Sequence, residues 1–566
     1  MADLDEKAEF QASHPIANLA NARESTTIVN QVATTLEGRW KHRIQWTGRF
    51  SAPVWAMLVL FLLPTEYLNE LNQPVEFSWA GRATLAMLIW MAVWWLTESF
   101  DLAVTSLLPV VMFPLLGIAS MKQATASYAN PMIFLFIGGF ILALAMQRWG
   151  VDRRLALVVL KRVGTRPAAM VAGFMLVTAG LSAFISNTAT TAMMLPIALS
   201  VISLVGHSDH ASGQNRPRNS NSPRSEQLRR NFAVCLLLAI AYAASIGGVA
   251  TIIGTPPNVF LIGFLKDSID PIYQIDISFV QWLKIGLPFT VIFLPLTWFL
   301  LTRLVFQIPA GEIPGSKLLV DQHYQKLGAI TADQWATGGV FCLTAIGWMT
   351  RSLWCEWRIT WNNAEYQPFV QLTDEWIAMI GAFLLFLVPA RGMPMALSSS
   401  AAPYRPAFLM DWKTAERLPW GILMLFGGGL SLAAAIQRNG VSEFFGSQAR
   451  FIANIPEFWI VLLVCLAVVY FTEVTSNIAT TATLLPILAA IAPALNIHPY
   501  LLVIPTAIAS SCAFMLPIAT APNAIIFGSG EVEISDMLKA GFWLNILSVV
   551  LSVAFAFGVV KPIMGI

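Results

Sequence analysis

The chain has 566 residues, of which 56% are hydrophobic and only 12% are charged, and its formal net charge is +2. Soluble globular proteins carry about 25% charged residues, so this composition excludes a soluble protein, and the small net charge gives no indication of nucleic-acid binding. The five cysteines are scattered and form no CxxC pair, so they predict neither a disulfide framework nor a metal centre. The apolar runs approach the ~20 residues that span a bilayer, which predicts a polytopic helical membrane protein.

Residues 1–52 are expected to form a tail on the cytoplasmic side of the membrane. The segment is polar and lacks the short apolar core of a signal peptide. It ends in a basic cluster that comprises Arg39, Lys41, Arg43 and Arg49. Because basic residues gather on the cytoplasmic side, we expect a cytoplasmic N-terminus and a location in the plasma (inner) membrane.

The first half of the chain, 53–306, contains a polar insertion inside apolar sequence. Four apolar runs come first, at about 53–70, 80–97, 101–119 and 129–149. The next run, 167–205, is too long for one span, and the polar Ser186-Asn187-Thr188 lies at its middle. Basic segments flank both of its ends, so both ends lie on the same side of the membrane. This pattern predicts a re-entrant hairpin of two half-helices with its tip at mid-membrane.

A broken helix is expected directly after this hairpin. The apolar run 231–264 is interrupted by Gly254-Thr255-Pro256-Pro257-Asn258. Adjacent prolines and glycines interrupt a membrane helix only where the freed backbone groups face protein, water or ions. A span at about 279–304 completes the first half, and 307–332 is expected to be a polar linker.

The second half, 333–566, repeats this plan. Spans are expected at about 335–353, 375–390 and 418–437, followed by a hairpin at 455–495, a broken span at 499–528 and a last span at 538–562. Phe471–Ile487 repeats Leu181–Ile197 with an offset of 477 − 187 = 290 residues. The segment from Ala519 to Asn523 repeats that from Gly254 to Asn258 with an offset of 523 − 258 = 265 residues. The sequence therefore contains an internal duplication.

The fold class predicted is an all-α polytopic membrane protein with about eleven transmembrane helices and two re-entrant hairpins in two inverted repeats. Counted from the span at 80–97, each repeat holds five crossings and one hairpin. Since five is odd, the second repeat starts from the opposite side of the membrane. The two Ser-Asn tips are then expected to meet near the midplane.

The tips carry groups that can bind both anions and small cations. Helix N-termini attract anions, whereas unwound carbonyls and helix C-terminal ends coordinate cations. Hydroxyl, amide and carbonyl oxygens suit a hard ion such as sodium. Ser182 and Ser186 are four residues apart and are expected on one helical face beside Asn187. The offset of 290 places Thr472 at the position of Ser182.

These motifs resemble the divalent anion–sodium symporter family. The likeness rests on the paired SNT-like segments, the broken GTPPN span and the early Trp94-Trp95-Leu96-Thr97-Glu98 segment, and it covers roughly 53–563. Members of that family carry dicarboxylates, citrate or sulfate. The resemblance implies eleven spans, a homodimer and an elevator movement.

The resemblance also implies the residues of the site. The first sodium site would use Ser182, Ser186, Asn187 and Gly254, and the second would use Thr472, Thr475, Asn477 and Ala519. Substrate contacts would come from Asn187, Thr188, Thr255, Asn477 and Thr520. Two positions depart from the family pattern. Ile478 stands where the first motif has a threonine, which is expected to affect which substrate fits, and Asp101 stands where relatives carry proline.

The sequence thus predicts a secondary carrier that moves a small divalent anion such as succinate, malate, fumarate or citrate with sodium ions. A sulfate-type symporter and a sodium-independent dicarboxylate exchanger of the same fold remain alternatives. An enzyme is not expected, because the apolar runs contain no recognisable nucleophile, metal cluster or nucleotide motif. Glu98 and Glu473 lie in or beside apolar runs, and we expect them near helix ends rather than in proton coupling.

Overall fold

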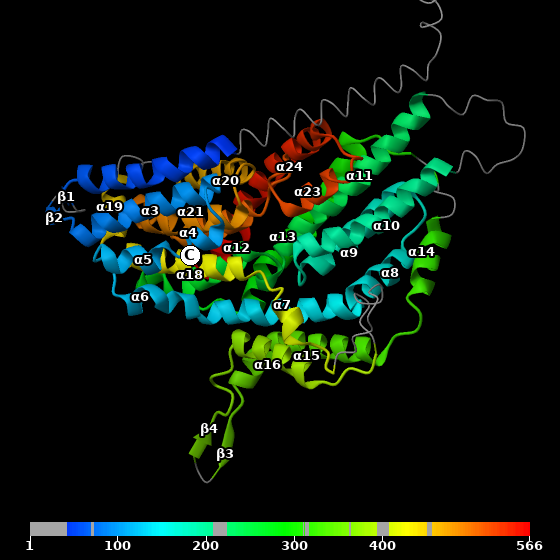
Figure 1. The fold of residues 1–566 in the computed structure, drawn as a ribbon, viewed down its shortest axis with the longest axis horizontal. Helices are drawn as coiled ribbons and strands as arrows, with labels where there is room; N and C mark the ends of the chain where they lie inside the picture. The colour runs from blue at the N-terminus through cyan, green and yellow to red at the C-terminus, as the bar shows by residue number, and fades with distance from the viewer. Residues whose placement is uncertain are drawn as a thin grey trace, which may run out of the picture.

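The computed structural model describes residues 42–68, 73–207, 223–309, 311, 316–361, 364–392, 407–449 and 455–566. Most of the expected N-terminal tail lies outside these residues. The described chain is a bundle of helices with two small antiparallel hairpins (Figure 1). The hairpins are β1 (Glu66–Leu68) with β2 (Pro74–Glu76), and β3 (Ile359–Trp361) with β4 (Ala364–Tyr366).

The helices follow the order expected from the apolar runs. After a helix over 42–62 come α3 (Trp79–Thr97), α4 (Leu102–Thr105), α5 (Leu108–Leu115), α6 (Met121–Ala126), α7 (Pro131–Trp149), α8 (Val151–Arg162), α9 (Pro167–Ser182), α10 (Asn187–His207), α11 (Pro223–Gly248), α12 (Pro256–Asp267) and α13 (Phe279–Phe299). The second half contains α14 (Ser316–Lys326), α15 (Ala332–Cys355), α16 (Asp374–Leu387), α17 (Trp412–Ala415), α18 (Trp420–Arg438), α19 (Val441–Ala449), α20 (Glu457–Thr472), α21 (Asn477–Ile491), α22 (Tyr500–Ser510), α23 (Ala521–Phe527), α24 (Ile534–Phe555) and α25 (Lys561–Met564).

Seven helices among the described residues are long and apolar enough to cross a membrane. Several other expected spans are divided or short. The run 101–119 forms two helices, α4 and α5, and the helices α9, α20, α21 and α22 have only 10–17 residues. The helical class is confirmed, whereas the count of eleven spans and two re-entrant hairpins stays a prediction.

The first described helix begins earlier than the expected span. It occupies 42–62, whereas the sequence predicted a tail to residue 52 and a span at 53–70. Contacts with the end of α3 and the residues after it hold this part of the helix against the bundle. The Arg49 guanidinium donates to the carbonyl of Ser99 (2.8 Å) and lies 5.0 Å from the ring centroid of Phe100, and Trp94 donates to the carbonyl of Gly48 (3.2 Å).

Helix α11 forms the centre of the bundle. Every residue from Phe232 to Gly248 is buried. Figure 1 shows α9 and α10 side by side, with α11 next to them. A Cβ at Gly247 would lie 2.3 Å from the carbonyl oxygen of Ala179, so only glycine permits this approach of α11 to α9. The hairpin α9–α10 is therefore packed tightly against the helix that precedes the first break.

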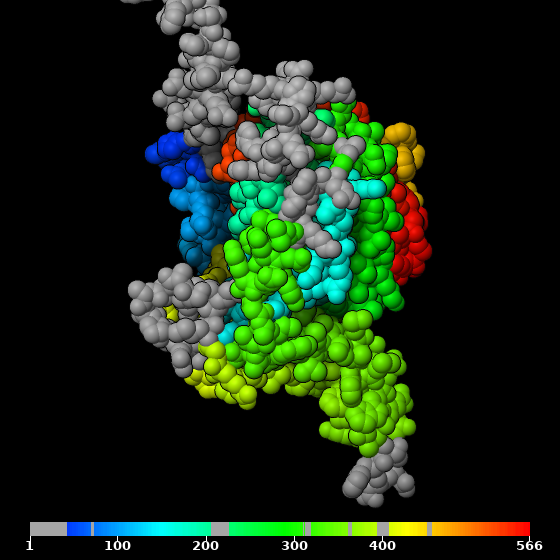
Figure 2. All heavy atoms as spheres, turned by 90° about the vertical axis from the view of Figure 1, so that its right-hand side faces the viewer, coloured from blue at the N-terminus to red at the C-terminus, as the bar shows by residue number. Residues whose placement is uncertain are grey.

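The segment expected as a polar linker contains a helix. Helix α14 packs on α8, and Figure 2 views the protein from the end where the two lie beside each other. Lys161 of α8 pairs with Asp321 of α14 (3.0 Å), and the Arg154 guanidinium donates to the carbonyls of Leu327 and Gly328 (both 3.1 Å). The region between the repeats is thus attached to the bundle.

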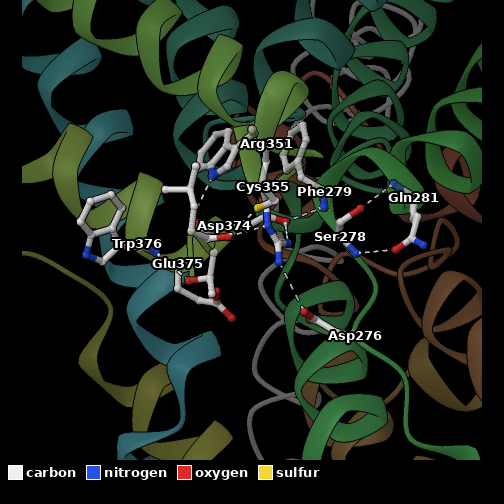
Figure 3. A network of polar contacts seen from close by, with 12 residues as sticks. Asp276, Ser278, Phe279, Gln281, Arg351, Cys355, Asp374, Glu375 and Trp376 are labelled. Carbon is white, nitrogen blue, oxygen red and sulfur yellow. Dashed lines mark hydrogen bonds and ion pairs between the residues drawn. The ribbon is translucent and has the colours of Figure 1, made fainter. Parts of the chain in front are cut away.

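At the opposite end of the bundle, ion pairs fasten the loop between α12 and α13 to α15 and α16. Lys266 pairs with Glu375 (3.0 Å) and with Asp276 (3.2 Å). Arg351 pairs with Asp374 (3.3 Å) and lies 3.6 Å from Asp276 (Figure 3). Each cation thus contacts the loop residue Asp276 and one carboxylate at the start of α16.

Candidate functional site

The first predicted tip is the turn between α9 and α10. The hydroxyl of Ser182 lies 2.5 Å from the side-chain oxygen of Asn187 and 2.8 Å from the carbonyl oxygen of Ala244 in α11. The helix ends at Ser182, so the expectation that Ser182 and Ser186 share one helical face is wrong. Ser186 instead caps α10, since its hydroxyl oxygen accepts from the backbone N–H of Ala189 (3.3 Å).

The second tip repeats this arrangement between α20 and α21. The hydroxyl of Thr472 lies 2.7 Å from the side-chain oxygen of Asn477 and 3.0 Å from the carbonyl oxygen of Ser510 in α22. A serine in one repeat and a threonine in the other thus hold the tip asparagine in the same way. Both hydroxyls are fully buried.

Each tip faces a break in the following helix. In the first repeat a short turn over Ile252–Gly254 separates α11 from α12, and in the second the chain is unwound between α22 and α23. The amide of Asn258 donates to the carbonyl of Thr251 (2.8 Å), and that of Asn523 donates to the carbonyl of Leu516 (3.0 Å). The donor and the acceptor of the second hydrogen bond each lie 265 residues after those of the first. Each asparagine therefore satisfies a carbonyl that the break sets free.

Backbone oxygens gather around Gly254. A Cβ at this position would lie 2.4 Å from the carbonyl oxygen of Gly248 and 2.9 Å from that of Ala183. A Cβ at Gly248 would lie 2.7 Å from the side-chain oxygen of Asn187. Only glycines allow these oxygens to approach so closely, and an oxygen-lined cradle of this kind suits a small hard cation.

Thr475 is placed differently from the other residues predicted for the second sodium site. Its hydroxyl donates to the carbonyl of Phe471 (2.9 Å) and lies 2.7 Å from the hydroxyl of Thr480. These contacts lie within the hairpin α20–α21. Its role as a sodium ligand stays a prediction.

Glu473 fixes the break in the second repeat and was not among the predicted site residues. It is 3% exposed. Its carboxylate accepts hydrogen bonds from the backbone N–H groups of Phe514 (2.6 Å), Met515 (2.9 Å) and Leu516 (3.0 Å) and from the amide of Asn545 (2.7 Å). The equivalent position of the first repeat, 473 − 290 = 183, is an alanine. The signal in the sequence was an acidic residue three positions before the second Ser-Asn pair.

Both tips and both breaks line one cavity of about 500 Å³. From the tips and breaks, its wall includes Ser186, Asn187, Thr188, Gly254, Thr255, Ser476, Asn477, Ile478, Ala519 and Thr520. All five residues predicted to contact substrate lie on this wall. Ser182, Thr472 and Thr475 do not, because they lie behind the tip asparagines and inside the hairpins.

The remaining wall comes from α3, α7 and the start of α18. Helix α7 contributes an apolar face with one polar residue, Gln147, near its end. In the part of the chain that the structure describes, two ionisable side chains complete the wall, Glu98 at the end of α3 and Arg417 just before α18. Neither was predicted to belong to the site, because nothing in the local sequence connects these positions with the Ser-Asn motifs.

Known transporters match about nine tenths of this chain. The chain is 37% identical over 523 residues to the sodium-dependent dicarboxylate transporter SdcS of Staphylococcus saprophyticus, which covers 92% of each chain. It is 36% identical over 509 residues to SdcS of Staphylococcus aureus USA300, which covers 90% of this chain and 91% of that one.

Two solved structures share the fold. The YdaH transporter of Alcanivorax borkumensis has a TM-score of 0.55 and 13% identity over 93% of this chain and 98% of its own. The efflux pump MtrF of Neisseria gonorrhoeae has a TM-score of 0.54 and 11% identity over 91% of this chain and 97% of its own. At this level of identity the likeness concerns the fold alone.

The resemblance seen in the motifs is confirmed by a match at the level of the family. Residues 45–566 match the family described as the sodium:sulfate symporter transmembrane region. The members of the matched family and the two relatives are transporters, in agreement with the expectation that the chain is not an enzyme. The chain therefore belongs to the sodium:sulfate symporter family, the family of divalent anion–sodium symporters.

Proposed function

We propose that this protein is a sodium-coupled carrier of small di- or tricarboxylates such as succinate, malate, fumarate or citrate. The observation that carries the proposal is the single cavity lined by both Ser-Asn tips and both helix breaks. A volume of about 500 Å³ is within the usual range for a small-molecule site. The names of the two staphylococcal relatives favour dicarboxylates over sulfate.

In the proposed site the substrate carboxylates meet neutral donors. Helices α10 and α21 begin at Asn187 and Asn477, so their N-termini lie at the cavity and attract anions. Thr188, Thr255 and Thr520 add hydroxyl donors on the same wall. Since none of these groups carries a charge, the anion is recognised without the tight hold of a buried cation and can leave again.

Sodium ions would bind beside the substrate. The first site would use Ser182, Ser186 and Asn187 with the oxygens around Gly254. The second would use Asn477, Thr472, Thr475 and the backbone near Ala519. A dianion bound with two sodium ions carries no net charge, so the membrane potential would not drive its transport. A third bound cation would be needed for the potential to drive uptake.

Alternating access would follow the elevator plan of the family, with the protein as a homodimer in the plasma (inner) membrane. If the N-terminus is cytoplasmic, then α3 and α7 both end on the cytoplasmic side. The cavity wall includes Glu98 and Gln147 from these ends. The described conformation would then be one in which the cavity reaches toward the cytoplasm.

Uptake into proteoliposomes tests the proposal. Radiolabelled succinate, malate, fumarate, citrate and sulfate are offered with an inward sodium gradient and again with sodium replaced by choline. We expect sodium-dependent uptake of at least one dicarboxylate and little uptake of sulfate. Sulfate uptake alone would favour the sulfate-type symporter, and succinate counterflow in choline with preloaded vesicles would favour the exchanger. No uptake of any of these anions would overturn the proposal.

The roles of the tips are tested by Asn187→Ala and Asn477→Ala. Each substitution removes an oxygen at the predicted junction of substrate and sodium. We expect each variant to reach the membrane at normal levels and to lose more than about 90% of uptake, since a lost charge-assisted hydrogen bond is worth roughly 1.5–3 kcal/mol. Full uptake by both variants would show that these asparagines serve helix packing only.

A further inference from the structure

We infer that Arg417 is the residue that attracts the anionic substrate into the cavity from its open end and thereby sets the affinity for dianions. The inference rests on the proposed function, since it concerns the same cavity. Among the described residues, Arg417 is the one lysine or arginine on the cavity wall. It lies far in sequence from both tips and in neither repeated motif.

The guanidinium of Arg417 is free to meet an anion. Its side chain is exposed and makes no hydrogen bond or ion pair with any described residue. The neighbouring Arg148 is different, because it is 6% exposed and pairs with Asp411 (2.7 Å). An unpaired cation on the wall of a concave, partly apolar cavity raises the local concentration of anions.

The backbone that carries Arg417 is held in place from the end of α7. Arg148 donates to Asp411 (2.7 Å) and to the hydroxyl of Thr414 (2.8 Å), and Asp411 also accepts from the backbone N–H of Thr414 (2.8 Å). The backbone N–H of Arg417 then donates to the carbonyl of Thr414 (3.1 Å). Since Arg148 follows Gln147, which lines the cavity, this clamp fixes Arg417 at the same rim.

Arg417 supplies a positive charge that the neutral groups of the two tips lack. A dianion that arrives before the sodium ions finds hydroxyl and amide groups but no charge at Asn187 or Asn477. Among the described residues, removal of Arg417 would leave the wall without a cation. The effect should fall with ionic strength, because salt screens exposed charges.

Succinate transport by three variants in proteoliposomes tests the inference. Arg417→Gln removes the charge, Arg417→Lys keeps it, and Lys413→Gln is the matched control. Lys413 is an exposed cation four residues earlier, on α17, and does not line the cavity. We expect Arg417→Gln to raise KM for succinate by roughly 3- to 10-fold, the range of a partly screened charge interaction, with kcat within about twofold of wild type. Arg417→Lys and Lys413→Gln should resemble wild type.

Added choline chloride at constant sodium separates electrostatic attraction from a structural role. Wild-type KM should rise with choline chloride, whereas KM of Arg417→Gln should change little. A variant Arg417→Gln with wild-type KM would overturn this inference while leaving the proposed function intact, and so would an equal salt response of variant and wild type. A wild-type protein without dicarboxylate uptake would overturn both.

Discussion

The hydroxyl of Thr472 lies 2.7 Å from the side-chain oxygen of Asn477, across the turn between α20 and α21. Ser182 and Asn187 make the equivalent contact in the other repeat. Each hydroxyl also reaches a carbonyl of the helix that follows the hairpin, α11 or α22, and so ties the tip asparagine to the element that leads into the helix break. The two tips are therefore fixed from behind, by residues that do not touch the cavity.

This arrangement predicts the effect of removing one hydroxyl. Thr472→Val keeps the shape of the side chain but frees the oxygen of Asn477 to turn. We expect the sodium concentration for half-maximal uptake to rise roughly 10-fold, which corresponds to the loss of about one hydrogen bond. The control is Thr483→Val on the following helix α21, because the buried hydroxyl of Thr483 makes no hydrogen bond with any described residue. An unchanged sodium dependence in Thr472→Val would contradict the role given to this hydroxyl.

The buried carboxylate of Glu473 predicts a second result. Glu473→Gln replaces a carboxylate that accepts four hydrogen bonds with an amide, whose nitrogen can only donate. We expect a loss of roughly 2–4 kcal/mol of stability, seen as a lower unfolding temperature in detergent, together with loss of uptake. Glu457→Gln on the same helix is the control. Its ion pair with Lys561 is more than one third exposed on both sides, so that variant should lose less than about 1 kcal/mol.

The departure at Ile478 predicts a change in selectivity. Ile478 and Thr188 are equivalent by the offset of 290, and both line the cavity. Ile478→Thr adds a hydroxyl, so malate, which carries a hydroxyl of its own, should gain over succinate by roughly fivefold, the effect of one hydrogen bond. The ratio of kcat/KM for the two acids measures this change. Ile422→Thr, the same substitution elsewhere on the wall, should leave the ratio unchanged, and an equal change in both variants would refute a specific role for position 478.

The pH dependence of stability should reveal Asp152 at the start of α8. Burial raises the pKa of its carboxyl to about 6 from an ordinary value of 3.8. The folded state therefore favours the protonated form, and stability is lost as the pH rises from about 4 to about 6. At pH 7.5 the free energy of unfolding of Asp152→Asn should exceed that of wild type by up to about 3 kcal/mol, seen as a higher unfolding temperature. The difference should shrink at pH 5. Equal pH profiles for the two proteins would contradict this assignment.

Much of the site could be predicted from the sequence, because the internal duplication repeats the site motifs at constant offsets. The offsets of 290 and 265 paired Asn187 with Asn477 and Thr255 with Thr520, and all four line one cavity. The breaks were predictable for a local reason, since glycines and prolines close together, as in Gly254-Thr255-Pro256-Pro257, disfavour a continuous helix. Boundaries were less certain. The first described helix includes 42–52, eleven residues that the sequence assigned to the tail, and contacts of Arg49 join this part to the end of α3.

The sequence by itself determined the membrane class, the duplication, and the hydroxyl and amide groups at each tip. Composition and repetition require no knowledge of which segments touch. Only the tertiary structure decided that Glu473 holds the second break, that Ser182 and Thr472 lie behind the cavity, and that Arg417 stands on its wall. These facts depend on contacts between residues tens to hundreds of positions apart, which helix packing selects and no local pattern encodes.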